Sequence, residues 1–71
     1  MHLYKSNGFT LHDIVELQTA YWQGDHAIIT SMYQSPRTGT VYAYVTIIDH
    51  SFHRGQTLKV IIPDEVRKIE E

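Results

Sequence analysis

The strongest constraint on the fold lies in residues 26–48, where two β-rich runs flank a turn-forming stretch. The runs, HAIITSMYQ and TVYAYVTII, are rich in Ile, Val, Thr and Tyr, which strands favour. Between them stands Ser35-Pro36-Arg37-Thr38-Gly39, in which proline presets φ for a turn and glycine supplies a positive φ. This pattern predicts a long antiparallel hairpin. It indicates a fold and carries no catalytic or cofactor signature.

The segment before the hairpin, residues 9–24, supports two secondary structures. A helix over residues 11–22, with a capping threonine before it and a glycine after it, would give an α+β fold. A strand over residues 13–17 would instead alternate apolar residues onto a sheet. We favour the strand, because Gln18 and Thr19 interrupt the helical stripe and the rest of the chain is β-rich.

Shorter elements surround this core. The Asn7-Gly8 pair favours a tight turn, so a strand over residues 3–5 is expected to fold back on residues 9–11. Alternation along the second hairpin arm separates an outer face from a predicted core face, and the core face holds Val41, Ala43, Val45 and Ile47.

The C-terminal part of the chain predicts one more long strand and a short closing element. Residues 57–62 alternate apolar and polar side chains, and Pro63 should end that strand because it cannot donate to a ladder. Residues 64–66 suit a single helical turn with acidic side chains. Residues 67–69 then form a last short strand or a terminal helix.

Two segments of the chain resemble parts of the Src-homology-3-like small barrel. His12-Asp13-Ile14-Val15-Glu16-Leu17 looks like the opening strand Gly-Asp-x-Val-x-Leu of such barrels, with histidine in place of glycine. Ile62-Pro63-Asp64-Glu65-Val66-Arg67-Lys68-Ile69 is similar to their closure by a proline, one turn and a final strand. The resemblance covers residues 9–69 and implies an all-β, five-stranded barrel with one short helical turn near the C-terminus. Residues 1–71 are expected to form a single domain, because so short a chain allows one core.

The resemblance also bears on function. In peptide-binding barrels a proline-rich ligand would lie near Tyr21, Trp22 and Pro63, yet this chain has neither the Ala-Leu-Tyr-Asp-Tyr signature nor the Trp-Trp pair. Ribosome- and transcription-associated barrels would imply a basic glycine-rich loop, and this chain offers only Arg37 and Arg54. Other small barrels of this type are noncatalytic subunits of larger enzyme complexes, including photosynthetic ones, and this chain is similar in size and charge.

Composition narrows the classes of partner. The formal charge of −2, from six basic and eight acidic residues, disfavours generic nucleic-acid binding. The longest apolar run, Val60-Ile61-Ile62, is too short for a membrane span, and the N-terminus lacks the apolar stretch of a signal peptide. With no cysteine, a cytoplasmic protein is expected. A chain this short buries only about 60% of its unfolded surface, which favours assembly with a partner or a second copy.

The histidines raise the question of a metal site or an enzyme. Asp49, His50 and His53 share one loop. The obvious further candidate ligand is His26, beside Asp25, which is distant in the sequence. Structural zinc needs four converging ligands, so we expect solvated loop histidines and no metal or other cofactor. The neighbours Asp25 and His26, or Asp49 and His50, could exchange protons, but adjacent strand residues point to opposite faces. The sequence therefore predicts no enzymatic activity.

The tyrosines are the best candidates for a binding surface. Tyr42 and Tyr44 lie opposite the predicted core face, and a cross-strand partner such as Tyr33 would join them in a patch with Ile48. Such a patch either shields the sheet or binds a partner protein, including a second copy in a homodimer. The predicted partner-binding residues are Tyr42, Tyr44, Tyr33, Tyr21, Trp22 and Arg37. The alternative is a nucleic-acid-binding barrel that uses Tyr42, Tyr44, Arg37, Arg54 and Lys59.

Overall fold

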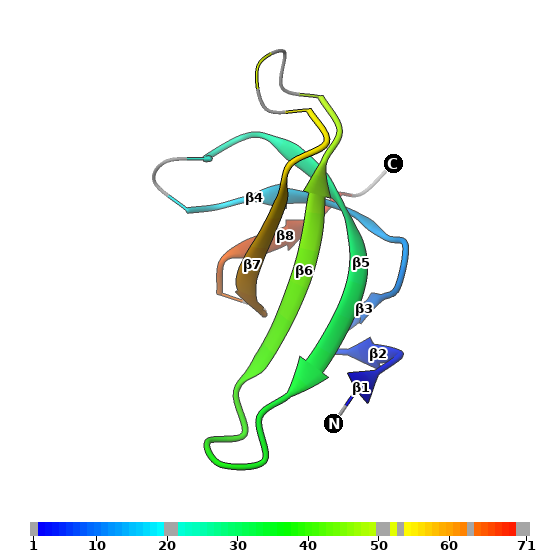
Figure 1. Ribbon diagram of the computed structural model, residues 1–71, viewed down its shortest axis with the longest axis vertical. Coiled ribbons are helices and arrows are strands. Elements are labelled where there is room, and N and C mark those ends of the chain that lie inside the picture. Colours follow the sequence, from blue (N-terminus) through cyan, green and yellow to red (C-terminus); the bar gives the residue numbers. More distant parts are fainter. Residues whose placement is uncertain (1, 20–21, 50–51, 53, 63, 70–71) are drawn as a thin grey trace.

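The protein is built from β-strands, as Figure 1 shows for the computed structural model. The structure describes residues 2–19, 22–49, 52, 54–62 and 64–69. In chain order the strands are β1 (His2–Leu3), β2 (Lys5–Ser6), β3 (Phe9–Thr10), β4 (Ile14–Leu17), β5 (His26–Gln34), β6 (Val41–Ile47), β7 (Thr57–Ile62) and β8 (Val66–Lys68). No helix occurs among the described residues, so the all-β prediction is confirmed and the alternative helix over 11–22 is wrong there.

The main sheet is antiparallel and has the strand order β7-β6-β5-β4-β8. Strand β1 pairs with the far end of β5, while β2 and β3 form a separate two-stranded ladder. Strands β7 and β8 stand at the two ends of the order, and no ladder joins them within the described chain. The sheet is therefore open, and β7 has a free edge.

The burial pattern of β4 explains why residues 14–17 form a strand and not a helix. Val15 and Leu17 are both fully buried, whereas the side chain of Ile14 is exposed to solvent. Burial at every second residue fits a strand and not a helix, whose buried positions recur every three to four residues. Pairing of β4 with both β5 and β8 satisfies its backbone on both sides.

The predicted hairpin is confirmed as β5 and β6. The Ser35 N–H donates to Thr40 O at 2.9 Å, and the Gly39 N–H donates to Ser35 O at 2.9 Å. Gly39 has φ of 76°, the positive value that favours glycine at this position. The turn chemistry read from the sequence therefore forms the connection between these strands.

The inner face of the sheet forms the core. All the residues predicted for the core face of β6 are buried. Among the described residues, the buried hydrophobic set is Phe9, Val15, Leu17, Ala27, Ile29, Met32, Val41, Ala43, Val45, Ile47, Val60, Ile62 and Val66. Strand β5 contributes both Ile29 and Met32 to it because a bulge lies between Ile29 and Ser31. The extra residue, Thr30, changes the parity of the strand so that both of its halves face inward.

The N-terminal turn also follows its prediction. Asn7 and Gly8 have φ values of 53° and 84°, which a tight hairpin turn of the primed type requires. The strands that flank it are β2 and β3, so the predicted strand over residues 3–5 overlaps β2 only at Lys5. Leu3 instead lies in β1, opposite Met32.

The predicted helical turn near the C-terminus is corrected to a simple turn. Asp64 and Glu65 form this turn, and Val66 already begins β8. Among the described residues, the backbone bond that closes it runs from the Glu65 N–H to Ile61 O at 3.0 Å, while the Glu65 carboxylate accepts the Ile61 N–H at 2.8 Å. A helix does not develop, because the chain enters the ladder with β4 at once. Pro63 lies outside the described residues.

Candidate functional site

The outer face of β5, β6 and β7 gathers three tyrosines and a lysine, here named the tyrosine–lysine cluster: Tyr33, Tyr42, Tyr44 and Lys59. Tyr42 of β6 stands opposite Tyr33 of β5, and Tyr44 stands opposite Lys59 of β7. These positions alternate with the buried residues of their strands, so the side chains leave the sheet on the side away from the core.

Three members of the cluster, Tyr33, Tyr42 and Lys59, are in direct contact. The rings of Tyr33 and Tyr42 are stacked, with centroids 5.4 Å apart and planes inclined by 26°. The ammonium of Lys59 lies 4.4 Å from the Tyr42 ring centroid and 5.9 Å from that of Tyr33. Both distances are within the range of cation–π attraction, so the lysine and the two rings hold one another in place.

Lys59 is a persistent positive charge in this cluster. A side-chain hydrogen bond with Tyr33 raises the pKa of Lys59 above its ordinary value, and electrostatic attraction to the same phenol adds to this effect. Since an ordinary lysine is already protonated at neutral pH, the ammonium stays charged. The outer face therefore combines apolar aromatic area with one fixed cation.

The cluster is open to solvent to different degrees. Tyr44 is 38% exposed, whereas Tyr33 and Tyr42 are half-buried against each other and Lys59. An amphipathic tyrosine ring that is rigid and partly exposed offers a large contact area at a small entropic cost. The surface has the chemistry to bind an apolar group together with a carboxylate.

The other predicted binding residues lie elsewhere. Trp22 packs against the core and lines a pocket of about 300 Å³ with Thr19, Leu58, Lys59 and Val60, beside the edge of β7. Arg37 is exposed in the hairpin turn. Tyr21 lies outside the described residues. Of the predicted binding residues that the structure describes, the tyrosines of β5 and β6 are the ones that come together.

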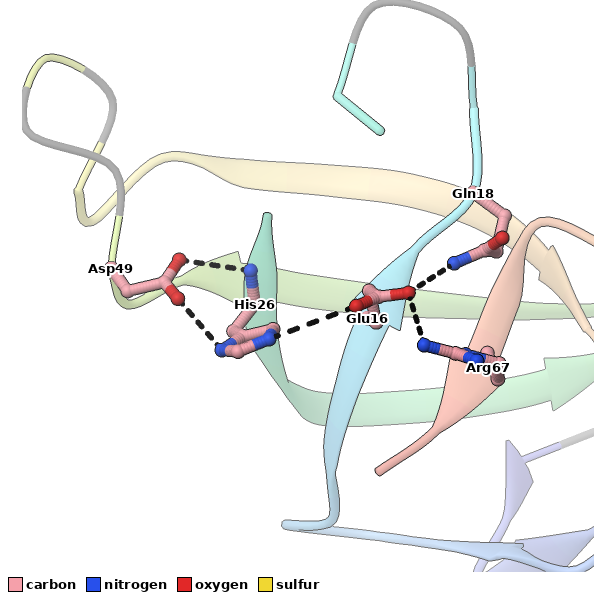
Figure 2. A network of polar contacts seen from close by, with 5 residues as sticks. All are labelled: Glu16, Gln18, His26, Asp49 and Arg67. Atoms are coloured by element: carbon pink, nitrogen blue, oxygen red, sulfur yellow. Dashed lines mark hydrogen bonds and ion pairs between the residues drawn. The ribbon is translucent and has the colours of Figure 1, made fainter. Parts of the chain in front are cut away.

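A polar network at the opposite end of β5 was not predicted (Figure 2). The backbone N–H of His26 donates to Asp49 Oδ1 at 2.8 Å, and His26 Nδ1 lies 2.7 Å from Asp49 Oδ2. On the other side of the ring, His26 Nε2 lies 3.9 Å from Glu16 Oε2. Asp49 thereby ties the end of β6 to the start of β5.

Glu16 extends the network to β8. Its Oε1 accepts hydrogen bonds from Arg67 Nη2 and from Gln18 Nε2, each at 2.7 Å (Figure 2). Beside these residues lies an open cavity of about 400 Å³, lined by Glu16, His26, Arg67, Lys68 and Ile69. The side chains of Glu16, His26, Asp49 and Arg67 are all partly exposed, and they join the ends of neighbouring strands.

The contact of His26 with Asp49 joins residues that are far apart in the sequence. Asp49 lies 23 residues after His26 in the chain, so this pair is not one of the sequence neighbours considered above. The sequence did hold a signal, since counting back from the hairpin turn through an unbroken ladder places His26 opposite Asp49. The bulge at Thr30 shifts the register by one residue, yet the aspartate remains within reach.

The described residues hold no group of three or more histidine, cysteine, aspartate or glutamate side chains arranged to bind a metal ion. Glu16 and Asp49 approach opposite nitrogens of the His26 ring, so their oxygens do not converge on one point. His50 and His53 lie outside the described residues. Over the described chain there is also no helix long and apolar enough to cross a membrane.

With this geometry established, the chain was compared with known proteins. No family model, curated protein or solved structure matches it.

Proposed function

We propose that this protein is a noncatalytic interaction module, an accessory subunit that binds a partner protein through the tyrosine–lysine cluster. The observation that supports it is the stacked pair of Tyr33 and Tyr42 with the Lys59 ammonium 4.4 Å from the Tyr42 ring, all on the outer face of the sheet. Tyrosine is enriched among residues that dominate binding energy at protein interfaces. The rings are already fixed by stacking, so little further entropy is lost on binding.

The distribution of charge supports a protein partner over a nucleic acid. Arg67 is paired with Glu16 at 2.7 Å, and Lys68 lies 3.9 Å from Asp13. Arg37 belongs to the turn at one end of the β5–β6 hairpin, and Arg54 to the connection at its other end. A nucleic-acid interface needs positive charges gathered on one face, and here Lys59 stands among tyrosines.

We further propose that β4 to β8 form a Src-homology-3-like unit, to which β1–β3 are an N-terminal addition. Support comes from the number and order of these strands, with the long hairpin in the centre and β8 beside β4. The short turn at Asp64 and Glu65 between β7 and β8 stands where the sequence resemblance places a single turn. In this proposal the five strands are those of a small barrel.

Capture of the partner tests the proposed binding face. Replacing Tyr42 and Tyr44 together with threonine keeps strand propensity and removes the aromatic contact area. We expect the double variant to bind the partner purified from the native host at least about thirtyfold more weakly, since interface hot spots are worth roughly 2 kcal/mol or more. Calorimetry with the purified partner gives the affinity.

A matched control comes from Tyr4, which is 72% exposed and lies outside the cluster. The Tyr4→Ser variant should bind as the wild type does. Equal affinity of the double variant and the wild type, with both folded by circular dichroism, would contradict the proposed face.

A further inference from the structure

Strand β7 has a free edge whose hydrogen-bonding groups can be assigned. At Ile61 these groups point away from β6, since the Ile61 N–H donates to Glu65 Oε1 and Ile61 O accepts from the Glu65 N–H. Backbone groups of an antiparallel strand change sides with every residue. Lys59 and Thr57 therefore present their N–H and C=O on this same side, where no described strand pairs with them.

A pocket runs beside this edge on the inner side. Thr19, Trp22, Leu58, Lys59 and Val60 line its volume of about 300 Å³. Leu58 is only partly buried, although it points toward the core. The Oγ1 atom of Thr19 is buried and has no hydrogen-bond partner among the described residues. Trp22, Leu58 and Val60 make this pocket largely apolar, so it suits the apolar side chains of a bound segment.

On the outer side, the same stretch of β7 carries the charge of Lys59. Within the described chain, no carboxylate lies at ion-pair distance from it, and its neighbours are tyrosine rings. A directly opposed residue on an added strand would have its Cβ about 5 Å from that of Lys59, within reach of a cross-strand ion pair. The electrostatic complement of this edge is therefore an acidic side chain.

We propose that β7 binds an extended polypeptide segment as an added antiparallel strand, with the sequence apolar–acidic–apolar and the acidic residue opposite Lys59. Backbone hydrogen bonds to Lys59 and Thr57 hold the segment, and its apolar side chains enter the Trp22–Leu58 pocket. The Glu65 contacts with Ile61 close the edge beyond Val60, so the recognised segment is short. This binding mode rests on the proposed function only for the claim that the partner is a polypeptide.

A second copy of this chain is a poorer occupant. Its own β7 would bring the sequence Leu58-Lys59-Val60 to the edge, with a lysine where the proposal requires a carboxylate. Like charges directly opposed across two strands are destabilising. Charge complementarity thus favours an acidic segment of another protein.

The test uses the peptide acetyl-Thr-Leu-Glu-Val-Thr-amide and the full chain labelled with ¹⁵N. We expect its addition to shift the amide signals of Thr57 and Lys59 and the indole signal of Trp22. In an antiparallel pair the glutamate N–H faces β7 and the N–H of the preceding leucine faces away. N-methylation of the glutamate should therefore abolish binding, whereas N-methylation of that leucine should leave it intact.

Exchange of charge tests the assigned register. Replacing the peptide glutamate with lysine should weaken binding about tenfold, and the Lys59→Glu variant should prefer the lysine peptide by a similar factor. Lys5→Glu, a charge reversal on β2, is the matched control and should leave both affinities unchanged.

Several results would overturn the proposal. These are no shift at β7 up to the solubility of the peptide, equal sensitivity to the two N-methylations, or shifts at Thr57 and Lys59 that grow with protein concentration alone. The last result would assign the edge to a second copy. Failure here while the Tyr42→Thr/Tyr44→Thr variant still loses its partner would refute only the edge proposal, and the reverse pair of results would refute only the tyrosine face.

Discussion

At the scale of single residues, alternation decides what each side chain does. Ile47 of β6 is fully buried, and Tyr44 three residues earlier is 38% exposed. Their separation on the two faces follows from the period of the strand, which the sequence alone displays. Stability is therefore expected from the inner residues and binding from the outer ones.

Truncation of Ile47 tests this division. Ile47→Ala should lower the free energy of unfolding by about 2–4 kcal/mol, because burial is lost and a cavity is left in the core. Tyr44→Ala removes a partly exposed ring and should cost less. Urea unfolding of the two variants gives the comparison, and a larger loss for Tyr44→Ala would mean that the faces are assigned the wrong way round.

Asp49 provides a second test at this scale. Its carboxylate accepts the His26 N–H and faces the His26 ring, so Asp49→Ala should lower the free energy of unfolding by about 1 kcal/mol, typical of a lost hydrogen bond. Faster amide hydrogen exchange at His26 should accompany the loss. Asp64→Ala, in the exposed turn before β8, is the control and should change neither quantity; equal effects of the two variants would contradict the assigned role.

At the scale of elements, the sequence predicted those features that depend on local chemistry. Pro36 and Gly39 indicated the hairpin turn, and Asn7-Gly8 indicated the N-terminal one, because these residues adopt the backbone angles that such turns require. The bulge at Thr30 was not predictable, since strict alternation through β5 is equally compatible with its composition. It arises from the need to bury Ile29 and Met32 in the same core.

Contacts between distant elements were also beyond the sequence. The Glu16–Arg67 ion pair exists because β4 lies between β5 and β8, which pairing of the whole sheet determines. Trp22 was grouped with the tyrosines from its chemistry, yet the loop after β4 directs it to the pocket beside β7. Neither the Glu16–Arg67 pairing nor the position of Trp22 can be deduced from the neighbouring residues in the sequence.

The β5–β6 turn offers a prediction at this scale. A Cβ at Gly39 would meet only Gln34 Nε2, at 4.0 Å, so space is available and the penalty is conformational. Because Gly39 has φ of 76°, Gly39→Ala should lower the free energy of unfolding by about 1 kcal/mol. Gly39→Asn should cost less, since asparagine tolerates positive φ. Thermal or urea unfolding measures both, with Arg37→Ala as the neutral control in the same turn; equal stability of Gly39→Ala and wild type would argue against the observed turn.

At the scale of the whole molecule, one curved sheet provides the core on one face and the proposed binding surface on the other. The molecule measures 36 × 24 × 18 Å, and the core occupies the inner face of the sheet. The outer face carries the tyrosine–lysine cluster, and the free edge of β7 adjoins it through Lys59. A chain of this size has a small free energy of unfolding, so binding of the proposed partner to this face would also stabilise the fold.

The central claim is that the partner covers the tyrosine–lysine cluster, and hydroxyl-radical footprinting with mass spectrometry tests it most directly. Oxidation of each tyrosine is measured for the free protein and for the complex with the captured partner. We predict that modification of Tyr42 and Tyr44 falls severalfold in the complex while that of Tyr4 is unchanged. Unaltered modification of Tyr42 and Tyr44 in a saturated complex would contradict the account.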